Sequence, residues 1–252
     1  MSTTTAPPAT DPAIGAELTL ERAELGHRGG PPVLGALDLR VAPGEVLTVV
    51  GPSGCGKSTL LRTLAGLLPP LGGEVTQDGG PITGPGADRA LVFQHDALLP
   101  WRTVRANIEL TLAIRRTPRG ERRRAASDWL ERVELSAHAA ELPHRLSGGQ
   151  RQRVQLARAL AGRPRAVLMD EPFGALDAHT RAGMQDLLVD ILRDTGATVV
   201  FVTHDVDEAL HLGDRVALLA TGQLLAVPHP RQRNAAEVPA TAALRRRILA
   251  SL

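Results

Sequence analysis

The segment Gly51-Pro-Ser-Gly-Cys-Gly-Lys-Ser-Thr59 has residue types and a spacing that suit phosphate binding. It fits the pattern G-x-x-x-x-G-K-[ST], in which glycines let backbone N–H groups converge on phosphate oxygens. Lys57 would reach the β- and γ-phosphates of a nucleotide, and the Ser58 hydroxyl would ligate Mg²⁺. The predicted phosphate contacts are Gly51, Pro52, Ser53, Gly54, Cys55, Gly56, Lys57, Ser58 and Thr59.

The use of lysine supports this interpretation. The chain has 29 lysine and arginine residues, and Lys57 is the only lysine. A compact ammonium group on a flexible stem has therefore been kept at this one position. The alternative is a glycine-rich turn with an unrelated lysine. The flanks disfavour it, because Val46–Val50 predicts a buried strand entering the loop and Ser58–Leu68 a helix leaving it. The N-terminus of that helix would add its dipole to the anion site.

A pair of carboxylates follows the apolar run Ala166–Met169. A strand that ends in Asp places a carboxylate at the C-terminal edge of the sheet, where open α/β sheets bind ligands. Asp170 is placed to hold Mg²⁺, directly or through water, and Glu171 to polarise a water aimed at the γ-phosphate. Without a second carboxylate, the alternative would be a protein that transfers phosphate rather than hydrolysing it.

A second anion site is predicted at Leu146-Ser-Gly-Gly-Gln150. Ser147 and Gln150 form an S-x-x-Q capping box, so a helix is expected to start here. Gly148 and Gly149 would expose the first N–H groups of that helix, but no lysine accompanies them. We interpret the segment as completing the nucleotide site of another subunit. A plain helix cap is the alternative, and it does not explain two glycines, which are poor helix formers.

The elements that position these residues alternate along the chain. The segments Glu17–Leu25 and Val33–Val41 predict two antiparallel strands. The helix after the phosphate loop should end at Pro69-Pro70, and residues 103–162 should be helical, with breaks at Gly120 and Pro143. Further strands are expected at 74–82, 90–93, 166–169, 198–202 and 215–219, and further helices at 178–194 and 206–212.

This order predicts an α/β fold with a parallel-sheet core, an N-terminal antiparallel β sub-domain and an inserted helical sub-domain. We expect a disordered tail at 1–16 and one domain at 17–252. The core would comprise 17–93 and 164–222, the helical sub-domain about 94–163, and a C-terminal extension 223–252.

Composition narrows the classes of function. The 252 residues suffice for one large domain, and a net charge of +2 gives no reason to expect a nucleic acid partner. Cys55 is the only cysteine, which fits a reducing cytosol. No apolar stretch reaches the roughly 20 residues of a membrane helix, so a membrane role would need a partner. The arginines at 115–124 predict a solvated helix face, with a lipid-headgroup site as the alternative.

In combination, these motifs resemble the nucleotide-binding subunits of ABC transporters over residues 17–222. The resemblance implies the P-loop NTPase fold, ATP and Mg²⁺ as cofactors, and a dimer with composite sites. It also assigns three further residues. Gln94 would be the Q-loop glutamine and a metal ligand, Asp177 would close the D-loop Gly174–Asp177, and His204 would contact the γ-phosphate.

Three segments narrow the resemblance to importer ATPases for taurine, alkanesulfonates, nitrate and thiamine precursors. They are Ile82–Arg89, Phe93–Trp101 and Asp170–Asp177. In that family the neighbourhood of Leu98, Leu99 and Trp101 receives a short helix of the membrane permease. The resemblance thus implies a peripheral protein on the cytoplasmic face of the membrane, served indirectly by a solute-binding protein.

One segment departs from the family pattern. The family stacks an aromatic residue on adenine before the first strand turn, but here the sequence is Leu25-Gly-His-Arg-Gly29, and the chain has no tyrosine. Arg28 best fits this position because a guanidinium plane can stack on a base, and His27 is the alternative.

Two other classes of protein share part of this set. A small-molecule P-loop kinase would use the phosphate loop but has no use for Leu146–Gln150. Non-transport ABC ATPases share all the motifs. The repair type needs a long coiled-coil insertion and the translation type two cassettes, and this chain has neither. A division-type signalling subunit stays as the alternative, disfavoured by Leu98–Trp101 and 82–89.

Overall fold

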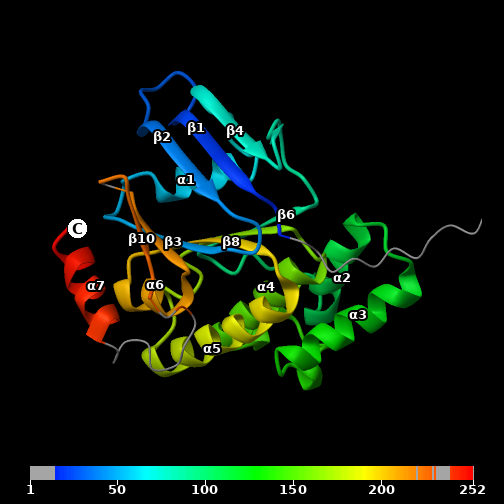
Figure 1. Ribbon diagram of the computed structural model, residues 1–252. Helices are drawn as coiled ribbons and strands as arrows, with labels where there is room; N and C mark the ends of the chain where they lie inside the picture. Colours follow the sequence, from blue (N-terminus) through cyan, green and yellow to red (C-terminus); the bar gives the residue numbers. More distant parts are fainter. Residues whose placement is uncertain (1–14, 220, 229, 231–238, 252) are drawn as a thin grey trace, which may run out of the picture.

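The computed structural model describes residues 15–219, 221–228, 230 and 239–251 (Figure 1). Two sheets and a set of helices form three layers. The strands are β1 (Leu18–Leu25), β2 (Leu34–Val41), β3 (Val46–Val50), β4 (Gly72–Gln77), β5 (Gly80–Pro81), β6 (Arg89–Val92), β7 (Ala166–Asp170), β8 (Thr198–Thr203), β9 (Arg215–Leu218) and β10 (Gln223–Ala226). The α-helices are α1 (Lys57–Leu64), α2 (Val104–Ile114), α3 (Arg119–Arg132), α4 (Gly148–Ala161), α5 (Ala178–Thr195), α6 (Val206–Leu212) and α7 (Pro239–Leu249), with 3₁₀ turns η1 (Ser136–His138) and η2 (Pro143–Arg145).

The central sheet has the order β10-β9-β3-β8-β7-β6, and all neighbours are parallel except β10, which is antiparallel to β9. The strands β3, β7 and β8 are buried on both faces, which explains their continuous apolar runs. Successive residues point to opposite faces. Val200 and Val202 therefore pack toward α1, while Val199 and Phe201 pack toward the helices on the other side. The predicted parallel-sheet core is confirmed.

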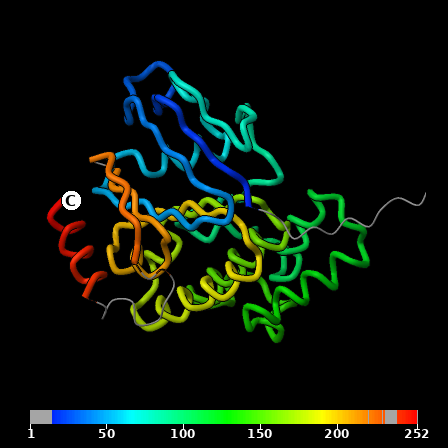
Figure 2. The backbone as a smooth tube through the Cα atoms, in the orientation of Figure 1, coloured from blue at the N-terminus to red at the C-terminus, as the bar shows by residue number. Residues whose placement is uncertain are grey.

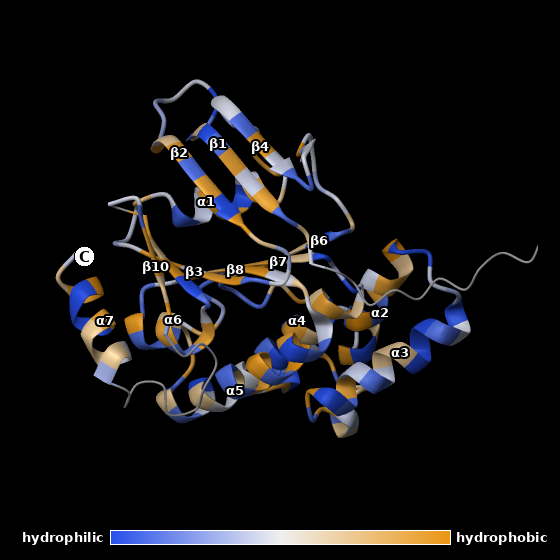
Figure 3. Cartoon of the chain, in the orientation of Figure 1, coloured by the Kyte–Doolittle hydropathy of each residue, from blue (hydrophilic) through white to orange (hydrophobic). Residues whose placement is uncertain are grey.

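The second sheet, β2-β1-β4-β5, is antiparallel and covers α1, which lies between the two sheets (Figure 1). Its β1–β2 pair matches the two antiparallel strands predicted at Glu17–Leu25 and Val33–Val41. The hydropathy colours show the same division, with apolar strands in the middle of the molecule and polar residues on the outer face of α3 (Figure 3).

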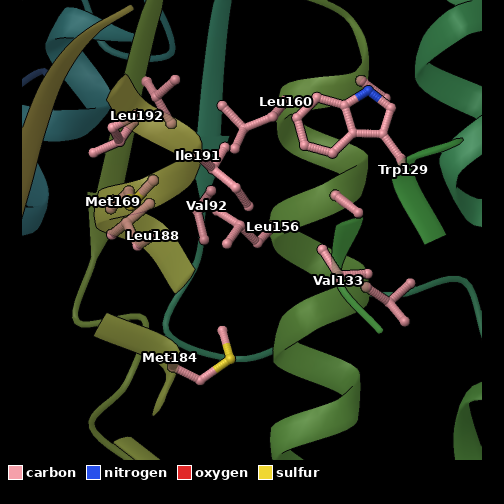
Figure 4. Packing of buried hydrophobic residues seen from close by; sticks show 14 of the residues in the cluster. Val92, Trp129, Val133, Leu156, Leu160, Met169, Met184, Leu188, Ile191 and Leu192 are labelled. Atoms are coloured by element: carbon pink, nitrogen blue, oxygen red, sulfur yellow. The ribbon is translucent and has the colours of Figure 1, made fainter. Parts of the chain in front are cut away.

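The helices α4, α5 and α6 lie along the other face of the central sheet, and α2 and α3 pack beside α4, as the smooth trace shows (Figure 2). Their core joins residues of several elements. Figure 4 shows Val92 of β6 and Met169 of β7 near Leu156 of α4 and Leu188 of α5, with Trp129 of α3 at the edge. This packing fixes α4, and thereby the Leu146–Gln150 segment at its start, against the strands that carry the phosphate chemistry.

Two predicted helix boundaries are wrong. The helix after the phosphate loop ends at Leu64, before Pro69-Pro70, because the chain turns at Gly66 with φ +76°. A Cβ on Gly66 would lie 2.2 Å from the carbonyl oxygen of Gly84, so only glycine fits. Gly120 is not a break, since it lies within α3, and the chain turns instead at Arg116, which has φ +59°.

The ends of the domain also differ from the expectation. Ala16 is fully buried and its N–H donates to Arg165 O, so the fold includes two residues of the expected tail 1–16, whose residues 1–14 lie outside the described part. In the expected extension 223–252, β10 joins the central sheet and α7 packs on α6 through the buried Ile248. Residues 229 and 231–238 of that extension are not described.

None of the helices in the described part of the chain is both long and apolar enough to cross a bilayer.

Candidate functional site

The phosphate loop lies between the end of β3 and the start of α1, as the sequence predicts. Gly54 and Gly56 have φ angles of +81° and +102°, which glycine adopts without strain. A Cβ on Gly56 would also lie 2.7 Å from Cγ of Leu34, the first residue of β2. The antiparallel sheet therefore presses against the loop, and Gly56 allows this close approach.

Lys57 is the first residue of α1 and is only 6% exposed. Its Nζ donates to the carbonyl oxygens of Gly51 at 2.7 Å and Pro52 at 3.0 Å. Glu171 Oε1 lies 4.0 Å from the same nitrogen. The ammonium is therefore held over the loop beside a carboxylate, so that one site contains the predicted phosphate ligand and the predicted base.

Glu171 and His204 come from neighbouring strands. Asp170, the last residue of β7, pairs with Val202 of β8, which places the residues that follow both strands at one sheet edge. His204 Nδ1 lies 3.0 Å from Glu171 Oε2, and the imidazole is 63% exposed. Glu171 has φ +43°, a conformation that is strained for a residue with a side chain and recurs at functional sites. The sequence predicts Lys57, Glu171 and His204 as parts of three separate motifs. The structure brings these side chains together at one site, the Lys57–Glu171–His204 group.

The helix predicted at Leu146–Gln150 is present, and the capping box is confirmed. Ser147 Oγ accepts from Gln150 N at 3.2 Å, and Gln150 Oε1 accepts from Ser147 N at 2.9 Å. A Cβ on Gly149 would lie 2.6 Å from Thr180 Cγ2, whereas one on Gly148 would meet nothing within 4 Å. Close packing on α5 thus explains Gly149, and Gly148 has no such structural reason.

The other predicted residues, Ser147–Gln150, Gln94, Arg28 and Asp177, make no hydrogen bond or ion pair to the Lys57–Glu171–His204 group in the described structure. Over the ranges described, no hydrogen bond or ion pair joins Ser147–Gln150, Gln94 or Arg28 to the phosphate loop. Asp177 caps α5, and its hydrogen bonds from Thr180 lower the pKa of this carboxyl below the usual range. Gln94 and Arg28 are exposed on their loops.

The segment that carries Gln94 is held by α4, a feature missed from the sequence. Gln155 Nε2 donates to the carbonyl oxygens of Phe93 and His95, and Arg158 donates to that of Ala97. Arg151 donates to Asp96 at 2.7 Å. These three α4 residues are spaced four and three apart, so they lie on one helix face. The sequence shows this spacing, but it does not show that the three side chains contact the segment Phe93–Ala97.

A second missed cluster lies beside His204. Arg181 of α5 donates to Leu176 O at 2.9 Å and lies 3.5 Å from Asp205, which caps α6. Glu208 on α6 is 5% exposed and accepts from Gln185 at 3.0 Å, and burial raises its pKa above the usual range. The cluster fixes the chain that follows His204.

The predicted exposed apolar patch is only partly correct. Trp101 is 73% exposed and Phe93 is 42% exposed. Leu98, in contrast, is buried in the core shared by α2 and α4, so it is not a surface residue. Trp101, with its indole exposed, does not pack into the helical block.

The residues predicted to hold a magnesium ion have donor atoms of a suitable type. Ser58, Gln94 and Asp170 offer oxygen donors, which Mg²⁺ prefers. The described residues contain no cluster of three His, Cys, Asp or Glu. Mg²⁺ commonly binds through one or two protein oxygens together with substrate phosphates and water, so one carboxylate beside a phosphate loop is sufficient.

Comparison with known proteins agrees with this arrangement. The family model described as ABC transporter matches residues 34–174. The taurine import ATP-binding protein TauB of Chromobacterium violaceum is 49% identical over 82% of this chain and 80% of its own length. The nitrate import ATP-binding protein NrtC of Synechococcus elongatus is 48% identical over 81% of this chain and 32% of its own length. A dimeric ATP-binding cassette bound to ADP and Pi matches with a TM-score of 0.72 at 33% identity, over 84% of this chain and 99% of that chain. This chain therefore belongs to the ATP-binding proteins of ABC transporters, and it is an ATPase.

Proposed function

We propose that two copies of this chain close around ATP and thereby power the import of a small anion or related nutrient through membrane permease subunits. The solute would be of the taurine, sulfonate, nitrate or thiamine-precursor type, and two of these, taurine and nitrate, stand in the names of the relatives. The protein would then lie on the cytoplasmic face of the membrane as a peripheral subunit, and a solute-binding protein would act through the permease.

The observation that carries this proposal is the separation of two anion sites within one chain. Lys57, Glu171 and His204 form one site at the edge of the central sheet. Ser147 caps α4, and no hydrogen bond or ion pair joins the Ser147–Gln150 segment to the phosphate loop in the described structure. A γ-phosphate held by the first site of one copy and the second site of its partner would satisfy both.

Each residue of the site has a part in hydrolysis. Lys57 binds the β- and γ-phosphates, and Asp170 with Ser58 and Gln94 would hold Mg²⁺, which neutralises charge on the phosphates. Glu171 accepts a proton from the attacking water, and His204, now 3.0 Å from Glu171, would turn to the γ-phosphate. Arg28 would stack on adenine. Because the γ-phosphate bridges two copies, ATP favours the closed dimer and hydrolysis releases it.

The trans contact can be tested with Ser147→Arg. We expect this variant to lose ATP hydrolysis while its monomer binds ATP normally, because the arginine obstructs the partner's site. A mixture with Lys57→Ala should recover part of the activity, since one composite site then carries both lesions and the other carries none. Steady-state hydrolysis of the mixture, measured against each variant alone, decides the question.

Ser147→Arg also removes the helix cap, because Ser147 Oγ accepts a hydrogen bond from Gln150 N. A second variant must therefore separate the loss of the cap from the added bulk. Ser147→Ala removes this bond, a change worth about 1 kcal/mol of helix stability, without adding bulk. It should retain more activity than Ser147→Arg. If Ser147→Arg weakens ATP binding to the monomer, the segment acts within its own chain and the composite site is wrong.

The permease contact can be tested with Trp101→Ala. Because the indole is 73% exposed, its removal should leave the melting temperature and the ATPase activity of the isolated subunit unchanged. Trp is favoured at interface hot spots, so the variant should lose its association with the co-expressed permease in a pull-down from membranes.

Ile114 offers a matched control, since it is also apolar and is 65% exposed on α2. Ile114→Ala should still bind the permease. Leu98→Ala should lower the melting temperature, because Leu98 is buried. Unchanged binding of Trp101→Ala would remove this surface from the proposal and leave the composite site unaffected.

A further inference from the structure

His138 contacts the side chain that caps α4. It ends the 3₁₀ turn η1, and its Nε2 lies 3.2 Å from Nε2 of Gln150. On its other side, Nδ1 lies 3.2 Å from Glu141 Oε1. Nδ1 is buried and makes no hydrogen bond of good geometry. The imidazole therefore lies between a carboxylate and the amide of the Leu146–Gln150 segment.

The hydrogen bonds of Gln150 determine which imidazole nitrogen carries the proton. Gln150 Oε1 accepts from Ser147 N at 2.9 Å, so the amide group that faces His138 is the NH₂. An NH₂ group can only donate. His138 Nε2 must then be the acceptor, and the proton of a neutral imidazole lies on Nδ1, beside the Glu141 carboxylate.

We propose that His138, as the Nδ1–H tautomer, is a positioning residue that orients the Gln150 amide and so keeps the Ser147–Gln150 capping box formed. The inference rests on the proposed function, in which this helix start completes the partner's nucleotide site. His138 does not touch the nucleotide. It acts through Gln150, whose amide would be free to rotate without an acceptor at Nε2.

This arrangement depends on the protonation of His138. An imidazolium donates from both nitrogens, so its Nε2–H would face the Gln150 NH₂. The Gln150 side chain could accept a hydrogen bond from His138 Nε2–H only by rotating its amide. That rotation would withdraw Oε1 from Ser147 N. Protonation and the capping box therefore compete. The proposal predicts that the site completed by Ser147 weakens as pH falls.

Glu141 is the charged group placed against the imidazole. Four arginines on the packed helices have other partners in the described structure. On α2, Arg105 pairs with Glu109, and Arg132 of α3 pairs with Asp194 of α5. On α4, Arg151 pairs with Asp96 and Arg153 with Glu134. Replacement of His138 by glutamine keeps an acceptor near the Nε2 position but cannot titrate.

The first test is spectroscopic and independent of ATP turnover. Nitrogen-15 NMR of the full subunit distinguishes an imidazole protonated on Nδ1 from one protonated on Nε2, and His138→Gln identifies the resonance. We expect the Nδ1–H form at neutral pH. In Gln150→Glu, where the facing group can only accept, the proton should move to Nε2. An Nε2–H tautomer in the wild type would overturn the proposal, whatever the activity.

The second test is the pH profile of ATP hydrolysis at saturating ATP, recorded for wild type and His138→Gln. The ratio of variant to wild-type kcat should rise by about threefold or more toward acid pH, the size expected for a lost cap. His204 is common to both proteins and cancels in this ratio. The control is His144→Gln, an exposed histidine on η2 beside the same segment, whose ratio to wild type should stay constant.

The outcomes separate this inference from the proposed function. A constant His138→Gln ratio, with the Nδ1–H tautomer present, would show that the capping box does not limit hydrolysis and would overturn the positioning role. A failure of the proposed composite site would instead appear as an active Ser147→Arg variant. His138→Leu, which has no acceptor, should lower kcat at every pH without changing ATP binding to the monomer.

Discussion

Lys57→Ala is expected to abolish ATP turnover and to weaken ATP binding. The loss of one preorganised cation at the phosphates should lower kcat by about 10²–10³-fold or more. A second effect should weaken ATP binding further. Among the described residues, Lys57 Nζ is the cation that pairs with Glu171, and it lies 4.0 Å from Oε1. Without it, the carboxylate repels the incoming phosphates. Steady-state hydrolysis and equilibrium binding of a fluorescent ATP analogue would measure both effects.

Lys57→Arg should not restore activity. Lys57 is 6% exposed, and its ammonium fits between the carbonyl oxygens of Gly51 and Pro52, where a longer planar guanidinium has no room. Arg62→Ala is the matched control, since Arg62 is an exposed cation on the same helix and should be dispensable. Near-normal hydrolysis by Lys57→Arg would contradict the assignment of this loop.

The fold could be predicted because its signals are local. The runs at β3, β7 and β8 are apolar throughout, since both faces of these strands are buried. The start of α4 followed from the capping box alone. The end of α1 could not be predicted, because it depends on the distant carbonyl of Gly84, which leaves room only for a glycine at position 66.

The site was predictable as motifs but not as contacts. Lys57 could be assigned a role because it opens a helix, and Glu171 because it follows a buried strand, whereas the role of His204 came from the family resemblance. The clamp of α4 on the Gln94 segment joins residues about 60 positions apart, so no local pattern reveals it. The burial of Leu98 was missed for a similar reason, since it depends on how α2 and α4 pack.

Glu171→Gln should bind ATP but hydrolyse it about 10²–10⁴-fold more slowly, the usual contribution of a general base. The two side chains have the same shape, so the substituted amide should stay beside His204, which lies 3.0 Å from the native carboxylate, and leave the phosphate loop undisturbed. Since hydrolysis is what opens the proposed dimer, the variant should accumulate as an ATP-bound dimer. Size-exclusion chromatography with ATP and Mg²⁺ would show the shift.

Two further variants test whether the effect of Glu171→Gln comes from the loss of the general base. Glu208→Gln is the matched control, because Glu208 is a buried carboxylate beside the same segment, and burial raises its pKa above the usual range. A neutral amide should replace it with little loss of activity.

Adding Lys57→Ala to Glu171→Gln should abolish the dimer, since the phosphates lose their cation. If Glu171→Gln stays monomeric with ATP while the wild type dimerises, either the base or the closed dimer is wrongly assigned. The residual hydrolysis rate distinguishes the two, because a wrong base would leave it unchanged.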